Sequence, residues 1–226
     1  MEQLECRTAV ISGASGAVGR HLLQKLLACQ SYSKIVSLVR KPSGIESSRL
    51  TELVVDFETL DQLGELEGLD AVEQIDDIYC CLGTTRKRAG SAQAFQRVDR
   101  DYVLKLARLG MRFNMQKFAV ISSVGAGKGS SGLYLKTKTE MEQQLGELNI
   151  PQLLIFRPSL LHGERAEFRL GEAVGFYALQ ALKWLPPLMK YQPVLTSQVA
   201  KAMLSITLNS QNENVRIVES MEMQKV

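Results

Sequence analysis

Residues 12–19 read Ser-Gly-Ala-Ser-Gly-Ala-Val-Gly, a glycine-rich turn that joins an apolar stretch of the chain to an amphipathic one. The apolar stretch, residues 8–11, predicts a short buried strand, and leucines at helical spacing after the turn predict a helix. Glycines in such a turn permit positive φ and let a pyrophosphate approach the backbone, while the first helical amides point at the anion. The turn therefore predicts a dinucleotide site.

The spacing of Gly13, Gly16 and Gly19 is G-x-x-G-x-x-G, whereas the commonest dinucleotide motif is G-x-G-x-x-G. A glycine match of this kind is weak on its own, because Gly13 and Gly16 could simply serve a tight strand-to-helix turn. The predicted strand before it and the predicted helix after it favour the cofactor interpretation.

The end of the second predicted strand, residues 34–39, indicates which dinucleotide binds. In a dinucleotide-binding fold the adenosine ribose lies here, and an NAD enzyme typically presents a carboxylate to its 2'-hydroxyl. This chain instead continues with Arg40, Lys41 and Pro42. A guanidinium can donate two hydrogen bonds to a 2'-phosphate, so Arg40 favours NADP(H) over NAD. The alternative is that Arg40 and Lys41 are solvated charges beside a turn-forming proline.

Composition is that of one α/β domain. The chain has 226 residues, of which 45% are hydrophobic, and 27 basic against 24 acidic residues leave a net charge of +3. Such a chain can bury a large core, and its charge balance carries no strong signature of polyanion binding. Only residues 86–88, Arg-Lys-Arg, would favour nucleic-acid binding, and a solvated loop or an extra phosphate contact explains them better.

The sequence also gives expectations about metal binding and cellular location. Four cysteines form no C-x-x-C pair, and the chain has two histidines, so a Cys/His zinc site is improbable and no metal is expected. Residues 1–5 lack the basic start and apolar run of a signal peptide, and no segment looks suited to span a bilayer. We therefore expect a cytoplasmic protein with reduced thiols.

The rest of the chain alternates between strand-like and helix-like patterns. Strands are predicted at 50–55, 77–82, 118–121, 152–156 and 215–218, and helices at 92–109, 134–148, 170–185 and 197–208. Alternation of this kind predicts parallel strands joined by helical crossovers, an α/β doubly wound parallel sheet of the Rossmann type. One domain would span 1–226, with residues 159–226 as a small substrate-side extension and 61–76 as a surface connection.

The predicted helix 92–109 has an apolar stripe. It comprises Phe95, Val98, Tyr102, Leu106 and Leu109. These spacings place the five side chains along one stripe of a regular α-helix.

Candidate site residues lie where strands end, because ligands of doubly wound sheets collect at the carboxyl ends of their strands. Asp56 and Phe57 follow the third strand and would place a carboxylate near the adenine, although an aspartate there is equally often a helix cap. Gly83 and Thr84 follow the fourth strand and offer a close backbone approach and a hydroxyl. Ser123 follows the fifth strand.

Tyr134 and Lys138 stand four residues apart, which places one above the other on a helix. The same stripe continues through Met141, Leu145 and Leu148, so Lys138 lies on the face expected to be buried. Lysine is seldom buried without a partner, and one alternative is that its ammonium group reaches solvent at the helix start. The functional interpretation is that an ammonium beside a phenol stabilises the phenolate for acid–base chemistry.

Uncommon strings carry a resemblance to a known family. They are residues 81–86, 97–103, 134–135 and 156–158. With the glycine motif, Ser123 and the Tyr134/Lys138 pair, they make the chain resemble the atypical NAD(P)-binding branch of the short-chain dehydrogenase/reductase superfamily. Within that branch it is similar to the HIV Tat-interacting protein (TIP30) family of oxidoreductases and its bacterial relatives.

The resemblance implies a bound NADPH and assigns roles to residues. The cofactor would be held by Gly13, Ser15, Gly16, Ala17, Val18, Arg40, Leu82, Gly83, Tyr134 and Lys138, with Arg157 near the nicotinamide end. Tyr134 would protonate a carbonyl oxygen during reduction, or act as the base in reverse. Lys138 would support Tyr134 and bind the nicotinamide ribose, and Ser123 would donate to the substrate oxygen. The short connection between Ser123 and Tyr134 leaves open whether the serine reaches the substrate.

A rival interpretation belongs to another class of protein. The chain could bind NADPH as a regulatory or interaction protein with little turnover, since a fold does not establish a chemistry. The predicted helix 170–185 would favour a protein partner or a membrane surface if its apolar face proved exposed. A homodimer is a further alternative. The presence of Ser123, Tyr134 and Lys138 together favours an enzyme that acts on a small carbonyl or alcohol.

Overall fold

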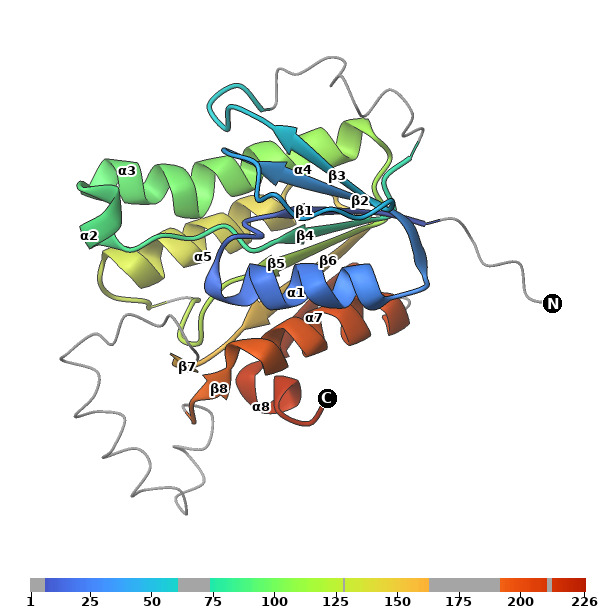
Figure 1. The fold of residues 1–226 in the computed structure, drawn as a ribbon. Coiled ribbons are helices and arrows are strands. Elements are labelled where there is room, and N and C mark those ends of the chain that lie inside the picture. Colours follow the sequence, from blue (N-terminus) through green and yellow to red (C-terminus); the bar gives the residue numbers. More distant parts are fainter. Residues whose placement is uncertain (1–6, 61–73, 128, 163–191, 211–212) are drawn as a thin grey trace.

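A parallel sheet of seven strands forms the centre of the computed structural model, which describes residues 7–60, 74–127, 129–162, 192–210 and 213–226 (Figure 1). The strands are β1 (Arg7–Ser12), β2 (Tyr32–Val39), β3 (Leu50–Val54), β4 (Asp77–Cys80), β5 (Lys117–Ile121), β6 (Gln152–Arg157) and β9 (Val215–Glu219). Their order is β3-β2-β1-β4-β5-β6-β9, and each neighbouring pair is parallel. The predicted doubly wound Rossmann sheet is confirmed.

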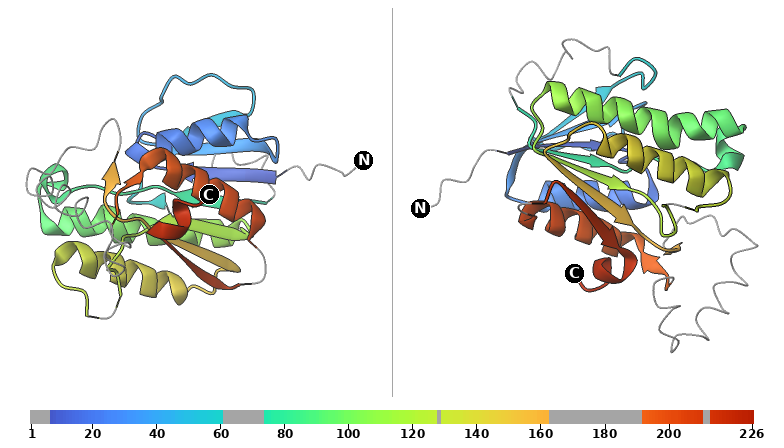
Figure 2. Two further views of the ribbon diagram at one scale, coloured as in Figure 1. Left: turned by 90° about the horizontal axis from the view of Figure 1, so that it is seen from below. Right: turned by 180° about the vertical axis from the view of Figure 1, so that it is seen from behind.

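Helices cover both faces of this sheet, as the two views of Figure 2 show. They are α1 (Ala17–Ala28), α2 (Arg86–Ala89), α3 (Ala92–Gln96), the π-helical turn η2 (Arg97–Asp101), α4 (Tyr102–Arg112), α5 (Leu133–Gly146), α7 (Thr196–Asn209) and α8 (Ser220–Met223). A separate two-stranded parallel sheet consists of β7 (Leu161–His162) and β8 (Val194–Leu195).

The hydrophobic core has two layers because the central strands are apolar on both faces. On one face α1 and α7 pack through side chains such as Leu22, Leu26 and Met203. On the other face α4 and α5 pack through side chains such as Leu106 and Met141. The helical apolar stripes thus turn towards the sheet from both sides, as the leucine spacing after the glycine turn predicts.

The strand order reverses next to β1, and doubly wound sheets bind their ligands at such a point. The chain runs from β1 outward to β2 and β3, and then crosses to β4 on the other side of β1. In doubly wound sheets this switch leaves a crevice beyond the carboxyl ends of the two central strands. The glycine turn after β1 and residues 81–84 after β4 both lie at this end (Figure 1).

The predicted helix 92–109 differs from the structure in its middle. It is divided into α3, η2 and α4, and the buried side chains after Phe95 are Asp99 and Val103, whereas Val98 and Tyr102 are half-buried. A π-helical turn adds one residue to the helix, which advances the buried face by one position. The predicted apolar stripe is confirmed at Phe95, Leu106 and Leu109, which are buried, whereas Tyr102 packs against the core only in part and Val98 is half-buried.

Other differences concern short elements. The helix α2, the two-residue strands β7 and β8 and the terminal helix α8 were not predicted, because segments of two to four residues carry too little periodicity. The predicted helix 170–185 and most of the surface connection 61–76 lie outside the described residues. Strand β9 and helix α7 belong to the main sheet and its covering layer.

Candidate active site

The glycine turn packs directly against the chain that leaves β4. Gly13 has φ +82°, and a β-carbon built on it would lie 2.5 Å from the carbonyl oxygen of Cys81. The amide of Gly16 donates a hydrogen bond of 2.9 Å to the carbonyl oxygen of Gly13, which closes the turn. Gly13 is thus required by both its backbone conformation and the close approach of β4.

Helix α1 begins immediately after this turn with its amino end available to an anion. Its N-cap, Gly16, supplies no side-chain hydrogen bond, and the first turn of α1 contains no acidic residue. Unbonded amides and the helix dipole make such an end attractive to phosphate. Ser15 is exposed, and the side chain of Val18 is buried, so Val18 can offer only its backbone to a ligand. These residues fit a dinucleotide pyrophosphate.

The residues predicted to surround the adenosine lie after β2 and β3. Arg40 directly follows β2 and its side chain is exposed. Asp56 is also exposed, and its Oδ1 atom accepts a hydrogen bond of 2.9 Å from the amide of Glu58, as a turn cap does. Phe57 is buried against the ring of Tyr102, with 5.6 Å between ring centroids. All three remain predicted cofactor residues, with Asp56 also serving the turn.

Lys138 is buried and paired with a carboxylate that the sequence reasoning missed. Its Nζ atom lies 3.1 Å from Oδ1 of Asp99, and both side chains are almost fully buried, at 3% and 2% exposure. Lys138 also donates to the carbonyl oxygen of Ile121 at 3.3 Å. The other oxygen of Asp99 accepts a bond of 2.8 Å from the amide of Thr84. The predicted burial of Lys138 is confirmed, and its partner is Asp99.

The charge of Lys138 is maintained despite its burial. Burial by itself lowers the pKa of Lys138, but the attraction of Asp99 and Tyr134 outweighs that effect and raises the pKa above its ordinary value. An ammonium group has three hydrogens. Asp99 and Ile121 accept two of them, so the third can reach a ligand hydroxyl.

Tyr134 lies in the first turn of α5, one turn before Lys138. Its side chain is at the border of exposure, at 36%, and its ring packs at 6.0 Å from the ring of Phe95. Phe95 belongs to α3, so the ring of Tyr134 is supported on one side by another helix. A supported ring that stays partly exposed suits a phenol that meets substrate.

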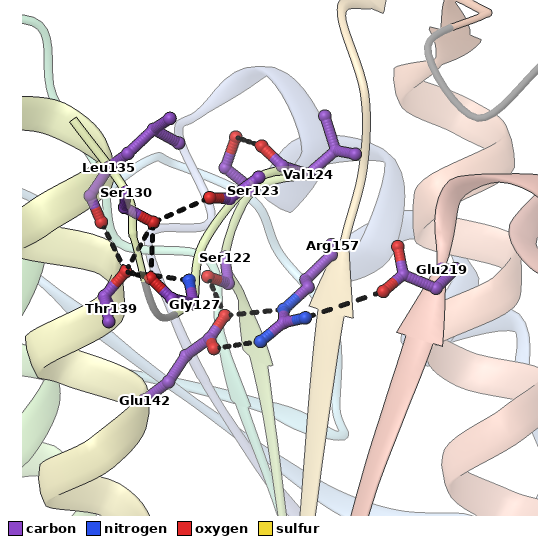
Figure 3. A network of polar contacts seen from close by, with 11 residues as sticks. Ser122, Ser123, Val124, Gly127, Ser130, Leu135, Thr139, Glu142, Arg157 and Glu219 are labelled. Carbon is purple, nitrogen blue, oxygen red and sulfur yellow. Dashed lines mark hydrogen bonds and ion pairs between the residues drawn. The ribbon is translucent and has the colours of Figure 1, made fainter. Parts of the chain in front are cut away.

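The serine hydroxyls around β5 differ in how firmly they are bonded (Figure 3). Ser122 donates to Glu142, and Ser130 donates to the carbonyl oxygens of Gly125 and Gly127 at 2.8 and 2.6 Å. Among the described residues, the hydroxyl of Ser123 makes only one long local bond, of 3.3 Å, to the carbonyl oxygen of Val124. Ser123 can therefore turn to a ligand at the smallest cost.

Arg157 ends β6 and joins three elements through two carboxylates. Its Nε and Nη2 atoms donate to Glu142 of α5 at 3.0 and 2.5 Å, and its Nη1 atom lies 3.6 Å from Glu219 of β9 (Figure 3). Hydrogen bonding to Glu142 raises the pKa of Arg157, so the guanidinium stays charged. The contact of Arg157 with the nicotinamide end stays a prediction, and its observed contacts join secondary-structure elements.

Arg157→Ala is expected to lower the free energy of unfolding by about 3 kcal/mol, because it leaves the buried carboxylate of Glu142 without its bidentate partner. Urea denaturation followed by circular dichroism measures this change. The matched control is Arg97→Ala, whose pair with Glu58 is 45% exposed on both sides and should contribute less than about 1 kcal/mol. Equal losses in the two variants would contradict a structural role for Arg157.

Comparison with known proteins places this site among NAD(P)-binding domains. A family model described as NAD(P)H-binding matches residues 13–172. Protein HTATIP2 from Rattus norvegicus is 36% identical over 223 residues, with 96% of this chain and 88% of the relative covered. Protein FMP52, mitochondrial, from Candida glabrata is 30% identical over 226 residues, with coverage of 96% and 94%.

Solved structures share the fold at low sequence identity. A short chain dehydrogenase from Burkholderia cenocepacia in complex with NADP superposes with a TM-score of 0.68 and 16% identity, covering 99% of this chain and 92% of that one. UDP-glucuronic acid 4-epimerase from Bacillus cereus in complex with NAD has a TM-score of 0.63 and 17% identity, with coverage of 94% and 77%. These similarities concern the fold alone. The dehydrogenase structure contains NADP, whereas the epimerase structure contains NAD.

The relatives correct one expectation about location. FMP52 proteins from Candida glabrata, Emericella nidulans and Scheffersomyces stipitis are named mitochondrial. Our expectation of a cytoplasmic protein, drawn from the first residues of the chain, was therefore wrong. In the described ranges, no helix combines the length and apolar character that crossing a membrane requires.

Proposed function

Since this chain belongs to the NAD(P)H-binding family and is a homologue of HTATIP2, we propose that it is an NADPH-dependent oxidoreductase of the short-chain dehydrogenase/reductase type. Its substrate would be a small carbonyl compound or the corresponding alcohol. The observation that carries the proposal is the buried, charged Lys138 one turn after Tyr134, whose side chain is 36% exposed. A buried charge of this kind is costly and is typical of functional sites.

The preference for NADP(H) rests on Arg40. Its side chain is exposed directly beyond β2, where the adenosine ribose of a dinucleotide lies in this fold. A guanidinium there suits a 2'-phosphate. The pyrophosphate would lie on the amino end of α1, held by Gly13, Ser15, Gly16 and the amides that follow.

The chemistry needs a proton donor, an orienting donor and the exclusion of water. When bound, NADPH supplies the hydride. Tyr134 would give its phenolic proton to the substrate oxygen, and the positive charge of Lys138 would stabilise the phenolate that results. Ser123 would donate a second hydrogen bond to the same oxygen. Within residues 159–226, the predicted substrate-side region, the β7–β8 sheet would contribute to the substrate side, whereas α7 and β9 complete the main fold.

Arg40→Ala tests the choice of cofactor. Removing hydrogen bonds to a charged phosphate costs about 1.5–3 kcal/mol, so the Kd for NADPH should rise about ten- to a hundredfold while the Kd for NADH stays unchanged. Both constants are measured by titrating the purified protein. The control is Lys34→Ala, which removes a cation at the opposite end of β2. Wild-type protein that binds NADH more tightly than NADPH would refute the role given to Arg40.

Turnover is tested separately by screening aldehydes, ketones and quinones for oxidation of NADPH. A protein that binds NADPH but reduces none of these compounds would contradict the proposed enzyme. It would support the NADPH-binding regulatory protein instead.

A further inference from the structure

The π-helical turn η2 directs a carboxylate into the candidate site. Asp99 lies in the middle of this turn and is 1% exposed, whereas the neighbouring charges of Arg97 and Asp101 are directed outward. A π-helical turn costs hydrogen-bond geometry and is frequently kept at functional positions. The irregular turn therefore has a specific result here, which is the burial of the Asp99 carboxylate.

The two oxygens of Asp99 bond to two different parts of the site. Oδ1 lies 3.1 Å from Nζ of Lys138 on α5, and Oδ2 accepts a bond of 2.8 Å from the amide of Thr84. Thr84 belongs to the segment after β4 that is expected to contact the cofactor. A single buried carboxylate thus links the lysine to the cofactor-binding segment.

Several groups face Lys138 from the elements packed around it. They are Asp99 from η2, Tyr134 from its own helix, Cys80 from β4 and the carbonyl oxygen of Ile121 from β5. Burial raises the pKa of Cys80 to about 12, so its thiol is neutral at physiological pH and contributes no charge. Among these groups of the described residues, Asp99 supplies the carboxylate that pairs with the Lys138 ammonium.

We propose that Asp99 is a positioning residue, which keeps Lys138 protonated and holds it in a fixed relation to the Thr84 amide and hence to the cofactor. This proposal rests on the proposed function for its connection to NADPH. The negative charge of the Asp99 side chain, and not its shape, is what this role requires. An asparagine would still accept the bond from Thr84, but it would leave the buried ammonium without a counter-charge.

The sign of the expected pH effect follows from these contacts. In the wild-type protein the pKa of Lys138 lies above its ordinary value of 10.5, so Lys138 stays charged across the physiological range. In Asp99→Asn the penalty of burial remains and the attraction is lost, so the lysine loses its proton at a lower pH. A neutral amine is a weaker donor to a ribose hydroxyl than an ammonium.

The test compares NADPH binding at different pH values. In Asp99→Asn the Kd should exceed the wild-type value by about tenfold near pH 9, and by a smaller factor near pH 6, where the amine regains its proton. Asp101→Asn is the matched control, because Asp101 pairs with Arg100 at the surface and should stay within about twofold of wild type at every pH. A variant weakened equally at all pH values would overturn the proposal, since a merely structural defect behaves in that way.

A second measurement needs neither a variant nor the cofactor. NMR of side-chain-labelled lysine in the free wild-type protein should show that Lys138 stays protonated at pH values above the ordinary lysine pKa. If Lys138 lost its proton at a pH below the ordinary lysine pKa, the role of Asp99 would be overturned, even if Asp99→Asn failed to fold. If this titration is as expected but NADPH does not bind, the proposed function fails and the link between Asp99 and Lys138 stands.

Discussion

Gly13→Ala is expected to lower the free energy of unfolding by more than about 4 kcal/mol and to abolish NADPH binding. The added β-carbon would lie 2.5 Å from the carbonyl oxygen of Cys81 and 2.6 Å from its carbonyl carbon. Backbone atoms cannot rotate away, so β1 and β4 would have to separate at the ligand crevice. The φ of +82° adds the strain of a left-handed alanine. Urea denaturation and titration with NADPH measure the two effects.

The control for this variant separates backbone strain from overlap. Gly90 ends α2 with φ +83°, nearly the value of Gly13, but a β-carbon there would meet no atom within 4 Å. Gly90→Ala should therefore cost only the strain of the left-handed conformation, about 1–2 kcal/mol. Similar losses for the two variants would show that the close approach of Cys81 to Gly13 does not govern stability.

Tyr134→Phe is expected to lower the rate of NADPH-dependent carbonyl reduction about 10²–10⁴-fold, which is the usual contribution of a general acid. The ring is kept, so its packing on Phe95 and the fold should survive. NADPH should bind within a fewfold of wild type, because the amino end of α1 and Arg40 are untouched. The measurement is steady-state kinetics on the best carbonyl substrate, with NADPH binding followed in parallel.

Tyr102→Phe is the matched control for this loss of a hydroxyl. The phenol of Tyr102 donates to Glu58 at 2.8 Å, away from Lys138, so its removal should leave turnover nearly unchanged. Full activity of Tyr134→Phe would exclude Tyr134 as the proton donor. A loss of NADPH binding in proportion to the loss of rate would assign Tyr134 to cofactor binding instead.

Much of the fold was predictable because its signals are local. The apolar residues of β1, the leucine spacing of α1 and the alternation that follows each depend on a few neighbouring residues. The π-helical turn was not predictable in this way. Its charged sequence, Arg-Val-Asp-Arg-Asp, resembles a solvated helix face, and only packing determines that Asp99 turns inward.

The candidate site was predictable to the extent that its residues share one element. Tyr134 and Lys138 lie on α5, and the stripe through Met141 indicates that Lys138 is buried. Pairs between distant segments leave no such pattern. Asp99 on η2 pairs with Lys138 on α5, and Arg157 on β6 pairs with Glu142 on α5.

The position of β9 determines when this protein can finish folding during its synthesis. Residues 215–219 pair with β6, which is made about sixty residues earlier, as the register of Leu153 with Val215 shows. Until β9 has left the ribosome, β6 presents an unpaired edge, and Arg157 lacks its contact with Glu219. Unpaired edges recruit strands from other chains. A nascent chain that stops before residue 213 should therefore aggregate and depend on chaperones, although its glycine turn and Lys138 are already made.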